Sequence, residues 1–85
     1  MVVRTVSILK ARDRVSAVLE PLLGFEMALE RANNIAQVLA FGVSHDPARV
    51  ALGMLERVGL HDPRAVAEEV GRVWCRSLGE TEAMA

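Results

Sequence analysis

Apolar and small residues recur along the first half of the chain at spacings that alternate between three and four. The positions are Ile8, Ala11, Val15, Val18, Leu22, Phe25, Leu29, Ala32, Ala36 and Leu39. This spacing puts all of them on one side of an α-helix, as in the seam between packed helices. The pattern predicts an all-α fold that begins with a helical arm over residues 7–41. Gly42, directly after Phe41, suits the end of that helix.

Pro21 interrupts the arm, because proline lacks the N–H that a helix interior uses and its ring clashes with the preceding turn. Gly24 weakens the same place. Either one long helix kinks at Pro21, or a first helix ends there and a second one folds back. The seam continues across the proline without a change of register, and no cluster of loop residues marks a reversal. We therefore expect a kinked arm.

The residues before the arm leave two interpretations open. Residues 2–6 are rich in β-branched side chains, which favour a short strand but are also compatible with the first turn of the helix.

The tripeptide His-Asp-Pro occurs twice, at residues 45–47 and 61–63. Aspartate is among the best N-terminal caps of a helix, and proline is well suited to the first helical position. The repeat therefore predicts two further helices, over residues 47–58 and 63–78, each followed by a glycine. Residues 80–85 are expected to form a flexible tail, which leaves a single helical domain over residues 1–79.

Both short helices are amphipathic, and we expect them to pack antiparallel to each other and against the arm. The residues predicted to hold them there are Val50, Met54, Leu55, Val70, Val73 and Trp74.

The size and composition of the chain favour self-association. A chain of 85 residues buries only about 60–65% of the surface that its unfolded form exposes, and its single cysteine cannot form an internal disulfide. A homodimer would cover the apolar side of the arm in a helical bundle. The residues predicted to carry self-association or partner binding are Leu22, Phe25, Leu29, Ala32, Ala36 and Leu39.

Charge and hydropathy narrow the class of protein further. The net charge of −1 gives no general attraction to nucleic acid or to anionic lipid. No apolar run reaches the length of a membrane span, and the N-terminal charges interrupt any signal-peptide core. We therefore expect a cytoplasmic protein.

Candidate catalytic and metal-binding residues have simpler structural interpretations. His45, Asp46, His61 and Asp62 are good metal-ligand types, but helix capping accounts for the repeat. Cys75 has no partner base in its local sequence, which a catalytic thiol needs. We expect no enzymatic activity, no metal site and no cofactor.

Nucleic-acid binding is the alternative function. Four basic residues, Arg4, Lys10, Arg12 and Arg14, stand against the single acidic Asp13 in the first fourteen positions. The segment 35–58, with IAQVLAFGVSHDPARVALGML, resembles a helix-turn-helix, and this resemblance implies a DNA-binding transcriptional regulator that also uses Arg49. Within it, FGVSHDPARVAL is similar to the first loop and second helix of ubiquitin-associated three-helix modules, from which no function is carried over.

The function that the sequence favours is a small non-enzymatic protein–protein interaction module. It would act as a regulator, adaptor or assembly factor, self-associate through the seam and bind another protein.

Overall fold

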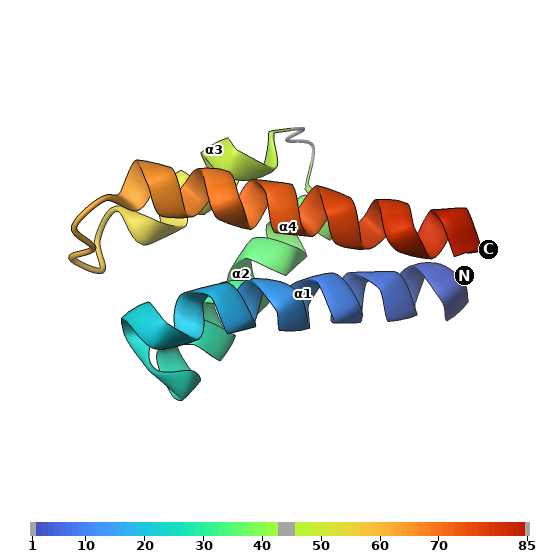
Figure 1. Cartoon of the computed structure of the whole chain (residues 1–85), viewed down its shortest axis with the longest axis horizontal. Coiled ribbons are helices and arrows are strands. Elements are labelled where there is room, and N and C mark those ends of the chain that lie inside the picture. The colour runs from blue at the N-terminus through green and yellow to red at the C-terminus, as the bar shows by residue number, and fades with distance from the viewer. Residues whose placement is uncertain (1, 43–45, 85) are drawn as a thin grey trace.

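Four helices make up the part of the chain that the structure describes. In this computed structural model the described backbone covers residues 2–42 and 46–84, and the described side chains cover residues 7–42 and 46–79. The helices are α1 (Val2–Leu23), α2 (Phe25–Phe41), α3 (Pro47–Leu55) and α4 (Pro63–Met84), and no strand occurs among the described residues (Figure 1). The predicted all-α fold is confirmed, and residues 2–6 belong to α1.

The first half of the chain is a helical hairpin, so the predicted kinked arm is wrong. Helix α1 contains Pro21 and ends at Leu23, and the chain reverses at Gly24, whose φ and ψ are 83° and 162°. Only glycine adopts that backbone conformation readily. The Gly24 N–H still donates to the carbonyl of Glu20 at 2.9 Å, which closes α1. The seam is therefore divided between two helices that pack against each other.

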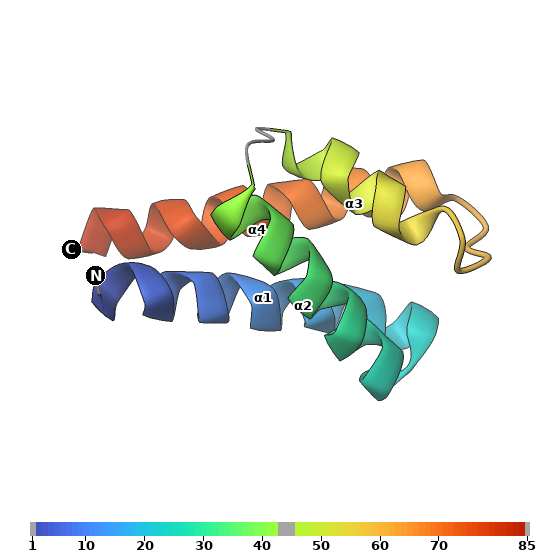
Figure 2. The same ribbon diagram turned by 180° about the vertical axis from the view of Figure 1, so that it is seen from behind.

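Helix α4 joins this hairpin to α3. It lies antiparallel beside α1, so that the beginning of α1 and the end of α4 share one end of the molecule (Figure 1). Helix α2 packs obliquely on α1 and also contacts α3, and α3 packs on the first part of α4 (Figure 2).

The hydrophobic core draws on all four helices. Half of its buried residues are alanines, which let the helix axes approach closely. Its fully or almost fully buried members are Ala11, Val15, Leu19, Ala28, Ala32, Ile35, Ala36, Ala51, Leu55, Ala67, Val70 and Trp74.

The two Asp-Pro pairs start helices as predicted. The Asp46 carboxylate accepts a hydrogen bond from the Arg49 backbone N–H at 3.3 Å, and the Asp62 carboxylate accepts one from the Ala65 N–H at 3.1 Å. Pro47 and Pro63 are the first residues of their helices. Each aspartate thus pairs one of the N–H groups that a helix start leaves unsatisfied.

The ends of these helices differ from the prediction. Helix α3 ends at Leu55 rather than residue 58, and Glu56 to Gly59 form turns, with Gly59 at a φ of 77°. Helix α4 continues through Gly79 to Met84, where a flexible tail was expected. A single glycine within a helix costs only about 1 kcal/mol relative to alanine, so it does not by itself end one.

The residues predicted to hold α3 and α4 in place lie at or beside the core. Leu55, Val70 and Trp74 are buried, whereas Val50, Met54 and Val73 are half-buried. Within the described ranges, none of the helices combines the length and the apolar character needed to cross a lipid bilayer.

Candidate interaction surface at the turn between α1 and α2

The six residues predicted to carry self-association have three different environments. Ala32 and Ala36 are buried in the chain's own core, and Leu29 and Leu39 are half-buried. Leu22 and Phe25 are exposed, with 51% and 64% of their surface open to solvent. The intramolecular hairpin therefore covers the alanine part of the seam and leaves its large side chains beside Gly24 open.

Leu22 and Phe25 are exposed although their positions in the helices place them on the core-facing side. Leu22 follows the fully buried Leu19 by three positions, and Phe25 precedes the fully buried Ala28 by three. Residues three apart share one side of a helix. The core-facing stripe of each helix thus continues beyond its last fully buried residue, Leu19 on α1 and Ala28 on α2, to the turn at Gly24.

We name Leu22, Phe25 and Leu29 the tip surface. Leu29 lies one helical turn after Phe25 and is half-buried. Met27 is also exposed, at 44%, but stands two residues from Phe25 and so lies on another side of α2. The sequence signal for this surface is the run of Leu22, Leu23 and Phe25 around a glycine.

Exposed carboxylates accompany the tip surface. Residues 15–30 contain Glu20, Glu26 and Glu30 and no lysine or arginine. All three glutamates are exposed. Glu26 lies in the first turn of α2, where a negative charge also stabilises the helix N-terminus. Glu20 is two residues from Leu22 and Glu26 directly follows Phe25, so these carboxylates lie on other sides of their helices than the tip surface. Arg14 and Arg31 flank the acidic stretch in the sequence.

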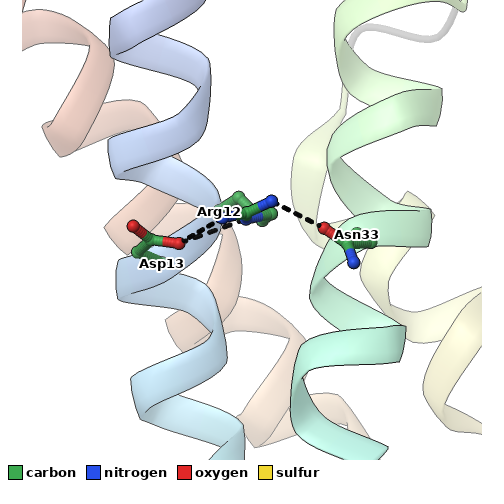
Figure 3. Close-up of polar contacts among 3 residues, drawn as sticks. All are labelled: Arg12, Asp13 and Asn33. Carbon is green, nitrogen blue, oxygen red and sulfur yellow. Dashed lines mark hydrogen bonds and ion pairs between the residues drawn. The ribbon is translucent and has the colours of Figure 1, made fainter.

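Two of the basic residues considered for nucleic-acid binding connect helices within the chain. Arg12 donates to the side-chain oxygen of Asn33 on α2 at 3.1 Å and pairs with Asp13 on its own helix at 2.8 Å (Figure 3). Arg14 donates to the hydroxyl of the buried Ser77 on α4 at 3.4 Å, and Ser77 in turn donates to the Val73 carbonyl at 2.7 Å.

The remaining basic candidates are divided between α1 and α3. Lys10 is exposed on α1, Arg49 is exposed on α3, and the Arg4 side chain lies outside the described side chains. In the segment 35–58, the predicted turn includes residues 43–45, which lie outside the described residues. Helix α3 directs Ala51 and Leu55 into the core.

The described residues hold no candidate metal centre. They contain no group of three or more His, Cys, Asp or Glu residues close enough to hold a metal ion. His45 lies outside them, His61 is exposed, and the carboxylates of Asp46 and Asp62 cap helices. Cys75 is exposed on α4, in a shallow groove that Pro47, Gly71 and Arg72 also line.

Comparisons with known proteins add no assignment: no family model, no curated protein and no solved structure matches this chain. The functional argument therefore rests on the residues and geometry described above.

Proposed function

We propose that the protein is a non-enzymatic protein–protein interaction module that self-associates through its tip surface. The observation that carries the proposal is the exposure of Leu22 and Phe25 on the core-facing stripe of their helices. Large apolar side chains that continue a core and remain open to solvent are typical of surfaces that another molecule covers. Such a module would work as a regulator, adaptor or assembly factor.

The total surface of the chain supports this proposal. Its accessible area is 5640 Å² for a mass of 9.3 kDa. A monomeric globular protein of that mass exposes about 5,000 Å². Each partner in a specific interface of standard size buries about 800 Å². The excess exposure is thus comparable to what one interface removes.

A symmetric dimer is the simplest form of this self-association. In a twofold interface the same patch of each copy packs on itself, so an apolar patch is self-complementary. Phe25 is the natural centre of the contact, because aromatic side chains contribute most to interface energy. Leu22 and Leu29 would surround it.

The experiment that tests the proposal is sedimentation of the double variant Leu22→Gln/Phe25→Gln. Both side chains are largely exposed, so the variant should fold as the parent does while losing the apolar contact. We expect the parent to sediment as a dimer and the variant as a folded monomer.

The matched control is Leu9→Gln, because Leu9 is 45% exposed on α1 and lies away from the turn. This control should stay dimeric. A parent that remains monomeric over the whole concentration range, or a double variant that remains dimeric, would refute the proposal.

Nucleic-acid binding has less support as a function. Arg12 and Arg14 are engaged with residues of α2 and α4, whereas phosphate contacts need basic side chains directed outward along one surface. Helix α3 carries a single basic residue, Arg49, near its start, which is little for reading base edges.

A further inference from the structure

We infer that two copies of this chain exchange α1 when they self-associate, by opening the hairpin at Gly24. The inference rests on the proposed function and adds the form of the dimer. In each copy α1 and α2 become one continuous helix, and α1 packs on α2 and α4 of the other copy. The single chain keeps the hairpin.

A single residue connects α1 and α2. Helix α1 ends at Leu23 and α2 begins at Phe25, whereas the loop of a helical hairpin usually has about 2–5 residues. Gly24 has a φ of 83° and a ψ of 162°, a combination that is essentially restricted to glycine. Short connections in an unusual conformation favour domain swapping. Gly24 is therefore the hinge at which the hairpin opens.

The first turn of α2 has backbone N–H groups that the hairpin does not satisfy. Gly24 is the N-cap residue and has no side chain that could accept from them. The N–H of Ala28 donates to the Gly24 carbonyl at 3.0 Å, but those of residues 25–27 have no partner among the described residues. In a continuous helix they donate to the carbonyls of residues 21–23. Opening the hinge thus forms backbone hydrogen bonds that the hairpin lacks.

The residues around the hinge are compatible with a continuous helix. Pro21 already lies within α1, so its missing N–H costs the same in both forms. The seam positions Val18, Leu22, Phe25 and Leu29 keep spacings of three and four across Gly24. A helical Gly24 therefore places the apolar stripes of α1 and α2 on one side of a single helix.

The site that α1 leaves on opening fits another α1. Ala11, Val15 and Leu19 are fully buried, and α1 packs on both α2 and α4. A single open chain would expose these side chains to water, which is unfavourable. A second open copy supplies the same helix, so a twofold exchange restores the packing of α1 in both copies.

Exchange also brings the two tip surfaces together. In the hairpin, the end of α1 lies directly beside the start of α2. After exchange that end belongs to the partner copy, so Leu22 of one copy lies near Phe25 of the other. The second copy that replaces α1 therefore also covers the exposed residues on which the proposed function rests.

Cross-linking between α1 and α2 tests the exchange. Arg12 donates to Asn33, so cysteines at these two positions report which copy supplies α1 (Figure 3). The variant is Arg12→Cys/Asn33→Cys, with the exposed Cys75 changed by Cys75→Ser. After dilution of the assembled dimer, a short bismaleimide should join two chains on a denaturing gel. A tip-surface dimer without exchange gives cross-links within single chains.

Variants of the hinge give a second measurement. Gly24→Ala should raise the dimer association constant about tenfold or more, because alanine is strained in the hairpin and favours the continuous helix. The matched control is Gly53→Ala on α3, where nothing lies within 4 Å of the added Cβ, and it should associate as the parent does. Sedimentation measures both.

Insertion of Gly-Ser-Gly after Gly24 has the opposite purpose. It lengthens the connection and interrupts the continuous helix, so it should abolish the cross-link between chains. Because the hairpin with its Leu22 and Phe25 is retained, this variant separates exchange from contact between folded tips.

Two results would overturn the inference: cross-links within single chains in a dimeric parent, or no more dimer in Gly24→Ala than in Gly53→Ala. Neither refutes the proposed function if Leu22→Gln/Phe25→Gln is monomeric. Conversely, cross-links between chains that persist in Leu22→Gln/Phe25→Gln would show exchange and refute self-association through the tip surface.

Discussion

Helix α3 packs closely on α4 because residue 71 has no side chain. A Cβ atom at Gly71 would lie 3.0 Å from the Ala48 backbone nitrogen and 3.2 Å from the Ala48 Cβ. Those atoms belong to the first turn of α3, which Asp46 caps, so they cannot move independently. The glycine therefore sets how near the start of α3 comes to α4.

Replacing Gly71 with alanine should lower the stability of the protein. A small-to-large change in a packed contact typically costs about 1–3 kcal/mol, which outweighs the gain of about 1 kcal/mol in helix propensity. Gly79→Ala in the same helix is the control, because nothing lies within 4 Å of its added Cβ. That variant should be more stable than the parent. Urea unfolding measures both, and equal stabilisation by the two changes would contradict the close contact.

Residues whose role is local could be predicted from the sequence, and residues whose role depends on a neighbouring helix could not. The caps at Asp46 and Asp62 act within one turn of chain, so the Asp-Pro pairs were sufficient to find them. The bond from Arg12 to Asn33 and the contact of Gly71 with Ala48 join residues far apart in sequence. Their neighbours become known only once the packing is known.

At the scale of elements, the hairpin depends on Gly24 rather than on Pro21. Helix α1 accommodates Pro21 within its last turn, and the reversal needs the conformation that Gly24 adopts. Both residues weaken a helix, so the sequence offered two places for an interruption. The spacing of the seam residues does not distinguish an interruption at Pro21 from one at Gly24. The register of the seam is the same whether the helix kinks or the chain folds back.

Gly24→Ala should destabilise the protein, whereas Pro21→Ala should not. An alanine at a φ of 83° and a ψ of 162° is strained by about 1–3 kcal/mol. Alanine at position 21 restores an N–H to an exposed position of α1 and leaves the turn at Gly24 unchanged. Thermal unfolding followed by circular dichroism compares the two variants. A larger loss for Pro21→Ala would place the essential break at the proline.

At the scale of the whole molecule, a single apolar seam is used in two ways. Its alanines pack α1 against α2 within one chain, whereas Leu22 and Phe25 beside Gly24 stay exposed, where we propose that a partner copy binds. The sequence predicted part of the stripe, since Ala11, Val15, Ala32 and Ala36 are all buried. The predicted seam did not include Leu19, Ala28 and Ile35, which are fully buried as well. The sequence also did not predict that these residues are buried by other helices of the same chain, because packing within a chain and packing between chains bury the same side of a helix.

If a partner copy covers the tip, the stability of the fold should depend on protein concentration. Binding to the native state alone adds about 2.7 kcal/mol when the partner is at 100 times its dissociation constant. A change of 1 kcal/mol moves the Tm of a domain of this size by about 4–8 °C. The Tm of the parent should therefore rise by several degrees across a wide concentration range. That of Leu22→Gln/Phe25→Gln should stay constant, because its unfolding involves one chain only. Calorimetry measures the Tm of both proteins. A parent Tm that does not depend on concentration would mean that self-association through Leu22 and Phe25 does not stabilise the fold.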